Sequence, residues 1–179
     1  MKKLLYILLA VSTVSCDGKL EEIPANQLAS NDFESVDGWM GDNTPPSLTK
    51  EKAHSGRYAL KVGPGVEYSM GYNNLLSKLS ASKVTKLKVR AWINLPNGTS
   101  QPVLVTAITD PNNPGAKPLV WEGLKLSDQV KSFNKWVEVE KTITFPATVN
   151  YTNKINVYLW RTGAVETALL DDLIIEKVE

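Results

Sequence analysis

The sequence has very little of the two side chains that build most zinc centres and thiol active sites. Among its 179 residues there is one cysteine, Cys16, and one histidine, His54. A zinc centre needs several nitrogen or sulfur ligands, and a cysteine nucleophile needs a histidine as its base. We therefore expect neither kind of site, and a single cysteine leaves no partner for an intramolecular disulfide. His54, in a His-Ser-Gly segment, is expected to support a turn.

The sequence also lacks the short motifs of common enzyme classes. It contains no Gly-x-Gly-x-x-Gly, no phosphate-binding loop and no Gly-x-Ser-x-Gly elbow. Glu138 and Glu140 lie on one face of a predicted strand, where we expect them to be solvated and not to form a glycosidase acid–base pair. Glu67 and Glu122 stay open as acidic candidates. We expect no catalytic residues and no enzyme activity.

An excess of charge of one sign is missing as well. The chain has 20 basic and 19 acidic residues, a net charge of +1, and neither a basic nor an acidic block. Proteins that bind nucleic acid usually carry a basic patch. Nucleic acid is therefore not an expected partner.

The N-terminal apolar run, Leu4 to Val11, is too short to span a bilayer. Two lysines precede it and small residues lead to Cys16, an arrangement typical of a bacterial signal peptide. The stretch resembles the signal of a bacterial lipoprotein, in the looser form found in Bacteroidetes-type lipoproteins, with Thr13 where a leucine is usual. We expect a signal peptide over residues 1–15 and a lipid anchor on Cys16. The alternatives are an ordinary secretory peptide with a leftover thiol and a buried N-terminal helix.

Residues 16–27 are polar and acidic and include a proline, which is typical of a tether between a lipid and a folded domain. Residues 28–179 then form one domain, because about 150 residues are enough for a single sizeable core. The expected location is the bacterial outer membrane, with the lipid on Cys16 as the membrane contact and the domain facing the periplasm or the cell surface.

The domain shows short β-rich runs separated by Gly, Pro, Asn and Asp, with almost nothing at helical spacing. This pattern predicts an all-β fold, an antiparallel β-sandwich or jelly roll. Only Leu75 to Leu79 is compatible with a helical turn. The predicted strands are Tyr58 to Val62, Glu67 to Tyr72, Thr85 to Leu95, Pro102 to Thr109, Trp136 to Phe145, Lys154 to Trp160 and Ala168 to Val178.

Two of these strands alternate clearly between apolar and other residues. In Lys86 to Ile93 the apolar set faces inward, which leaves Trp92 on a charged outer face. In Ile155 to Trp160 the same reasoning leaves Tyr158 and Trp160 on the outer face.

Large aromatic side chains on a polar sheet face often mark a binding surface. Sugar rings stack on aromatic planes, and their hydroxyls need polar partners. The predicted ligand-binding residues are Trp92, Tyr158, Trp160, Arg90 and Asn156, extended by Tyr72 and Trp121. The alternative is that these rings cover the sheet edge or lie under the loop Asp110 to Lys117. Trp136, at the start of a strand, is assigned a structural role.

Several segments in order resemble carbohydrate-binding modules with the galactose-binding-domain-like jelly roll. The resemblance covers the chain from Leu28 to the C-terminus and implies that fold together with carbohydrate binding. The segments are Asn31-Asp32-Phe33-Glu34, Gly38-Trp39, His54 to Val62, Lys88 to Ile93, Lys135 to Val139 and Leu169 to Ile175.

The resemblance also implies a structural calcium ion, which prefers hard oxygen ligands. Glu34 and Asp171 are the implied side-chain ligands, with Asp172 as substitute and carbonyl groups near Asp32 and Ser55 completing the shell. The residues themselves add that a carboxylate on an apolar strand is costly to bury unpaired. The alternative is that Asp171 pairs with Arg57 or Lys52 or faces water.

The sequence therefore predicts a lipid-anchored, non-catalytic module that binds polysaccharide or glycan through an aromatic-bearing sheet face. Because the chain holds one such domain, a glycan-degrading enzyme would be a separate partner. The alternative is a structural or adhesive surface lipoprotein whose sandwich contacts another protein in a surface complex. A groove with free polar groups would favour sugar, and a flat apolar patch would favour protein.

Overall fold

The computed structural model describes residues 23–38 and 43–179. The predicted signal peptide, Cys16, most of the tether and Trp39 lie outside these residues. Within the described ranges, no helix is long and apolar enough to cross a membrane.

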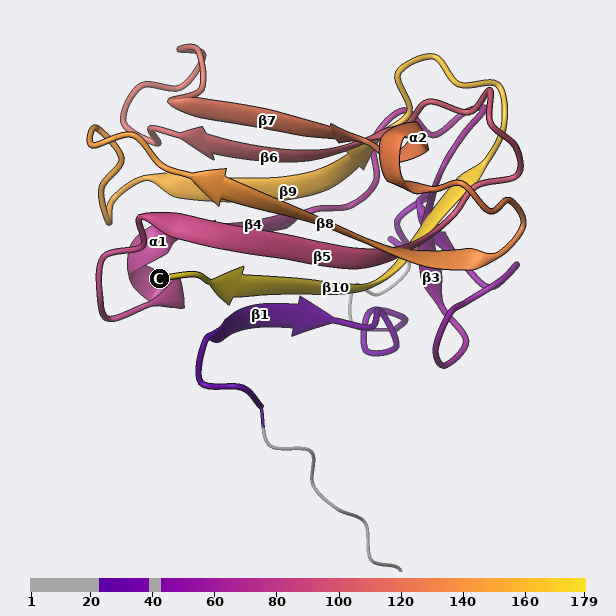
Figure 1. Ribbon diagram of the computed structural model, residues 1–179, viewed down its shortest axis with the longest axis horizontal. Helices are drawn as coiled ribbons and strands as arrows, with labels where there is room; N and C mark the ends of the chain where they lie inside the picture. The colour runs from indigo at the N-terminus through magenta and orange to yellow at the C-terminus, as the bar shows by residue number, and fades with distance from the viewer. Residues whose placement is uncertain (1–22, 39–42) are drawn as a thin grey trace, which may run out of the picture.

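The strands form two antiparallel sheets, as the sequence predicts (Figure 1). The six-stranded sheet has the order β2-β3-β10-β5-β8, and β1 pairs with β10 on the same side as β3. Its strands are β1 (Gln27–Asn31), β2 (Leu48–Thr49), β3 (Ala59–Val62), β5 (Lys86–Asn94), β8 (Trp136–Thr144) and β10 (Ala168–Lys177). The four-stranded sheet has the order β4-β9-β6-β7, formed by β4 (Tyr72–Leu75), β6 (Val103–Thr109), β7 (Val120–Lys125) and β9 (Lys154–Trp160).

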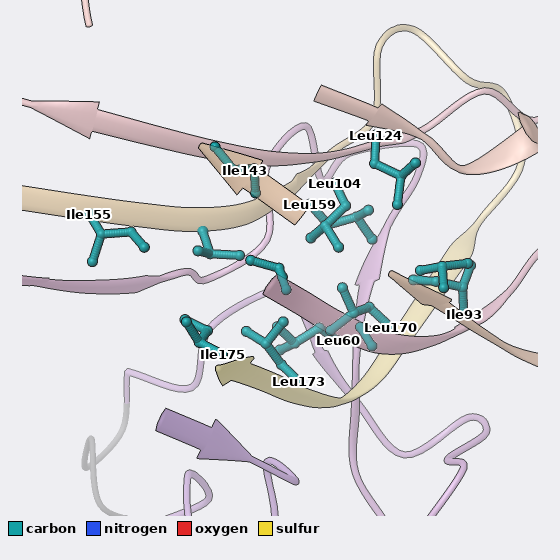
Figure 2. Packing of buried hydrophobic residues seen from close by; sticks show 14 of the residues in the cluster. Leu60, Ile93, Leu104, Leu124, Ile143, Ile155, Leu159, Leu170, Leu173 and Ile175 are labelled. Atoms are coloured by element: carbon teal, nitrogen blue, oxygen red, sulfur yellow. The ribbon is translucent and has the colours of Figure 1, made fainter. Parts of the chain in front are cut away.

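The core lies between the two sheets and follows the predicted alternation. On β5 the residues Leu87, Val89, Ala91 and Ile93 are all buried. On β9 the buried set is Ile155, Val157 and Leu159. Figure 2 shows leucine and isoleucine side chains from both sheets in this layer, among them Leu104 and Leu159 of the four-stranded sheet and Leu60 and Leu170 of the six-stranded sheet. Each sheet therefore turns one face to the core and the other to solvent.

Six of the seven predicted strands are present, and β9 begins and ends at the predicted residues. The predicted strand Glu67 to Tyr72 is wrong, since a strand begins only at Tyr72. The physical reason is Ser69, whose hydroxyl accepts the backbone N–H of Leu159 at 3.0 Å, where a carbonyl would serve in a regular ladder.

Four strands and one helix were not predicted, namely β1, β2, β4, β7 and α2 (Leu126–Gln129). The predicted helical turn is present as α1 (Leu76–Leu79). β7 has the sequence Val-Trp-Glu-Gly-Leu-Lys. Its glycine and charged residues interrupt the alternation of apolar and polar residues by which a strand is predicted. This strand matters because it forms one border of the candidate site.

Candidate functional site

Residues on the outer face of the four-stranded sheet are aligned in rows by the strand register. Asn73 on β4 lies opposite Asn156 on β9, and Asn156 lies opposite Ala107 on β6. Ala107 in turn lies opposite Trp121 on β7. The row therefore runs from two amides across a small residue to an indole.

These side chains line a cleft of about 770 Å³ on the outer face. Its lining includes Tyr72, Asn73, Trp121, Lys154, Asn156 and Tyr158. The floor is low because the residues that β6 contributes to the lining, Ala107 and Thr109, are small. A hollow with aromatic and polar walls thus crosses the sheet.

Four aromatic rings gather on this face. The ring centroids of Trp121 and Trp160 lie 6.5 Å apart in an edge arrangement, and those of Tyr68 and Trp160 lie 6.1 Å apart with nearly parallel planes. Tyr158 packs edge-on against Tyr68 at 5.9 Å. Trp121 is 49% exposed and Tyr68 55% exposed, so part of each side chain is accessible to a ligand.

Two neighbours hold the tryptophans in place. Gly123 leaves room for the Trp121 ring, because a Cβ atom at this position would lie 2.9 Å from Trp121 Cη2. Glu67 accepts the indole N–H of Trp160 at 2.9 Å and the Nε–H of Arg161 at 2.7 Å. The hydrogen bond from Trp160, with that from Arg161, lowers the pKa of Glu67 below its ordinary value.

Polar groups connect across the floor of the cleft. The Asn73 side-chain amide donates to Asn156 Oδ1, and the Asn156 amide donates to Thr109 Oγ1 at 3.3 Å. The Oδ1 atom of Asn73 and the second N–H of each amide remain for a ligand. Such groups suit hydroxyls spaced along a sugar chain.

The structure brings five of the seven predicted ligand-binding residues to the cleft or its border. Asn156, Tyr158 and Trp121 line the cleft, and Trp160 lies beside them through its contact with Trp121. Tyr72 lies at the border of the cleft but is in register with the core residue Val157, and its ring packs against the core.

Trp92 and Arg90 lie elsewhere, which corrects the expectation of one shared face. Both belong to β5 of the six-stranded sheet, and they point away from the core on the opposite side of the sandwich from Tyr158. Arg90 donates to Glu176 at 3.0 Å and to Glu138 at 2.7 Å, so its guanidinium is engaged. The alternation of a strand shows which residues face outward, but not to which sheet the strand belongs.

The Trp92 ring instead packs on His54. The two rings are stacked with centroids 3.9 Å apart, and Trp136 meets the His54 ring edge-on at 5.8 Å. His54 Nδ1 lies 2.6 Å from Asp172 Oδ2. His54 therefore anchors the segment that precedes β3, and Trp136 has a structural role because it packs against His54.

The predicted calcium ligands Glu34 and Asp171 converge on this same segment. Glu34 Oε1 accepts the backbone N–H groups of Arg57 and Tyr58, both at 2.7 Å. Asp171 Oδ2 accepts those of His54 at 2.7 Å and Ser55 at 3.1 Å. Within the loop of residues 54–58, Asp171 therefore binds the first two residues and Glu34 binds the last two.

Asp171 is fully buried, and burial raises its pKa to about 6 against the opposing effect of its backbone hydrogen bonds. The alternative in which it pairs with Arg57 or Lys52 or faces water is therefore wrong. The remaining predicted groups are close: Asp172 Oδ1 accepts the Ser55 hydroxyl at 2.7 Å, and Asp32 Oδ1 accepts the Glu34 N–H at 3.2 Å.

In the described part of the chain, no group of three or more histidine, cysteine or acidic side chains could hold a metal ion. A site built from Glu34, Asp171 and backbone carbonyls does not need such a group. Both carboxylates accept backbone N–H groups of the same loop, and calcium binding stays a prediction.

Sequence reasoning missed Tyr68, Asn73, Thr109 and Lys154. For Lys154 a signal was present, because it shares the outer set of β9 with Asn156 and Tyr158 by period-two spacing. Asn73 and Thr109 become neighbours of Asn156 only through strand pairing, which no local pattern reveals.

Comparison with solved structures shows the same sandwich in xylan-binding domains. The CBM22-1 xylan-binding domain of Paenibacillus barcinonensis Xyn10C matches with a TM-score of 0.51 and 20% identity, over 86% of this chain and 95% of that one. The CBM22-2 xylan-binding domain of the same protein matches with a TM-score of 0.52 and 16% identity, over 84% and 99%. At these identities the likeness shows a shared fold.

A third similar structure is the CBM22-1–GH10 part of Clostridium thermocellum Xyn10B, complexed with xylohexaose. Its TM-score is 0.51 at 13% identity, over 86% of this chain and 29% of that one. No curated protein matches the chain. The family model described as carbohydrate binding domain, CBM_4_9, matches residues 25–163. With the jelly-roll sandwich and most of its length matched, the chain belongs to this carbohydrate binding domain family.

Proposed function

We propose that the protein binds a glycan chain in the cleft of the four-stranded sheet and does not cleave it. The observation that carries this proposal is the row from Asn73 and Asn156 to Trp121, which puts hydrogen-bonding amides and an exposed ring in one hollow. Sugars present both C–H faces and hydroxyls, so they need both kinds of partner.

In this proposal the rings of Trp121 and Tyr158 contact the sugar faces. Trp160 and Tyr68 continue the aromatic surface beyond the cleft, so the chain runs over more than one ring. Because Asn73, Asn156 and Thr109 are already linked by hydrogen bonds, few side chains lose freedom when the ligand binds.

Binding without hydrolysis is supported by the lining of the cleft. A glycosidase of the usual kind places two carboxyl groups beside the scissile bond. No aspartate or glutamate is among the described residues that line this cleft. Glu138 and Glu140 lie on the other sheet beside Arg90 and Lys88.

The rival function, contact with a protein partner, would favour a flat apolar patch. The cleft instead has amide, hydroxyl and ammonium groups in its walls, which favours a polar ligand.

The test is retention of Trp121→Ala and Tyr158→Ala variants on immobilised polysaccharides. Xylan is included first, because two of the similar structures are described as xylan-binding domains. The matched control is Trp92→Ala, which removes an aromatic ring from the opposite face. Loss of retention in the cleft variants with wild-type retention in the control supports the proposal. Equal retention in all three, with intact thermal unfolding, would refute this site.

We further propose lipid attachment at Cys16 and a calcium ion held by Glu34, Asp171 and neighbouring carbonyls. Mass spectrometry of the membrane-extracted protein tests whether Cys16 carries a lipid. Thermal unfolding with calcium and with a chelator tests the ion, since a ligand that binds the folded state raises the midpoint. An unchanged midpoint at millimolar calcium would contradict the ion site.

A further inference from the structure

We infer that the glycan bound in the cleft carries negative charge, as a uronic acid carboxylate or a sulfate ester, and that Lys154 recognises this charge. The inference rests on the proposed glycan binding in the same cleft. Of the described residues that line the cleft, Lys154 alone carries a charged side chain at neutral pH.

Lys154 lies at one end of the polar row. It is the first residue of β9, and it shares the outer face with Asn156 because two residues separate them along the strand. Its register partner on β6 is Thr109, whose hydroxyl accepts from Asn156. The ammonium group therefore ends a line of neutral hydrogen-bonding groups.

Among the other partly buried basic side chains of the sandwich, Lys86 donates to the backbone oxygen of Glu179 at 3.0 Å and Lys177 donates to Ser82 Oγ at 2.7 Å. The other five each lie against a carboxylate. Their ion pairs are Lys61–Glu51 at 2.8 Å, Lys88–Glu176 at 3.3 Å, Arg90–Glu138 at 2.7 Å, Lys141–Glu122 at 2.7 Å and Arg161–Glu67 at 2.7 Å.

Lys154 is also partly buried, yet it forms no ion pair with any described residue. The acidic residue next to its register partner, Asp110, accepts the backbone N–H of Asn112 at 2.9 Å within its own loop. The described part of the chain thus supplies a cation to the cleft without a counter-ion.

This arrangement selects for charge on the ligand. A neutral sugar offers the ammonium group of Lys154 hydroxyl oxygens as hydrogen-bond acceptors. Only an anionic ligand adds a counter-charge to these hydrogen bonds, which strengthens them. The lack of carboxylates in the wall also removes repulsion that would otherwise weaken binding of an anionic chain.

The experiment measures affinity for matched pairs of polysaccharides by calorimetry. The acidic members are glucuronoxylan, polygalacturonate and dextran sulfate. Their neutral partners are the two carboxyl-reduced polymers and unmodified dextran, so the carboxylate and sulfate arms are separate. The variants are Lys154→Ala and Lys154→Arg, and the control is Lys135→Ala, which removes an exposed lysine before β8.

We expect at least one acidic polymer to bind about fivefold or more tightly than its neutral partner, since a partly exposed ion pair is worth this order of affinity. Lys154→Ala should abolish the difference, whereas Lys154→Arg and Lys135→Ala should keep it. Raising the salt concentration should reduce the difference as well.

Equal affinity for both members of every pair would overturn the inference and leave glycan binding standing. So would an acidic preference that survives in Lys154→Ala. Failure of all acidic polymers to bind would also overturn it, and the Trp121→Ala comparison on neutral glycans would then decide the proposed function separately.

Discussion

The indole N–H of Trp160 donates to Glu67 at 2.9 Å, which fixes an aromatic ring of the candidate site through a residue outside any strand. Arg161, the next residue along the chain, donates to the other oxygen of the same carboxylate at 2.7 Å. Glu67 is thus a positioning residue for the aromatic surface, and its own side chain does not need to touch sugar.

The Glu67→Ala variant should bind glycan about threefold more weakly, because Trp160 loses the acceptor that sets its ring angle. Glu67→Gln keeps an acceptor oxygen and should lose less. Isothermal titration with the best-binding polysaccharide measures the change. Identical affinities for all three proteins would contradict the positioning role.

Binding should also depend on pH through Glu67. Its pKa is lowered in the folded protein, first by the hydrogen bond from Trp160. The contribution of this carboxylate is therefore complete above its ordinary pKa and is lost as the pH falls through the lower, folded value. We expect constant affinity between about pH 7 and pH 5, then a decline below about pH 4. Tryptophan fluorescence titrations should show this decline in the wild type and a flatter curve in Glu67→Gln.

Gly123→Ala should weaken glycan binding by displacing the Trp121 ring. The added Cβ would lie 2.8 Å from Val103 Cγ1 and 2.9 Å from Trp121 Cη2, and the exposed ring is the easier of the two to move. The thermal unfolding midpoint is the accompanying measurement. Full affinity with an unchanged midpoint would show that binding does not require the Trp121 ring to lie next to Gly123.

Gly56→Ala should lower the free energy of unfolding more than Gly163→Ala. Both glycines have positive φ, +57° and +78°, a conformation that costs alanine about 1 kcal/mol. At Gly56 the new Cβ would also overlap the Glu34 carboxyl group, whereas at Gly163 no atom lies within 4 Å.

We expect the Gly56 variant to lose about 2 kcal/mol or more in urea unfolding. Losses of the same size in both variants would mean that the Glu34 contact contributes nothing to the loop.

Arg90→Ala should lower stability and leave glycan binding unchanged. Arg90 donates to Glu176, whose side chain is only 9% exposed, and its removal leaves Lys88 as the remaining basic partner. We expect a loss of about 1 kcal/mol in the free energy of unfolding. Reduced glycan affinity at full stability would place the ligand on the six-stranded sheet instead.

The sequence predicts the all-β sandwich, and it predicts individual strands well where alternation is strong, as on β9. It fails where a side chain takes part in the ladder, as Ser69 does, or where a strand carries glycine and charge, as β7 does. Outward-facing aromatics were found correctly on β5 and β9. Their division between two faces depends on strand order, a long-range property that separates Trp92 from Trp160.

The last strand, β10, occupies the interior of the six-stranded sheet, with β5 on one side and both β1 and β3 on the other. All three neighbours come earlier in the chain, and none of their pairings with β10 is local. During translation the sheet therefore stays open until residues 168–177 have been made. We expect a newly made chain lacking this strand to expose apolar edges and to depend on chaperones until the strand is added.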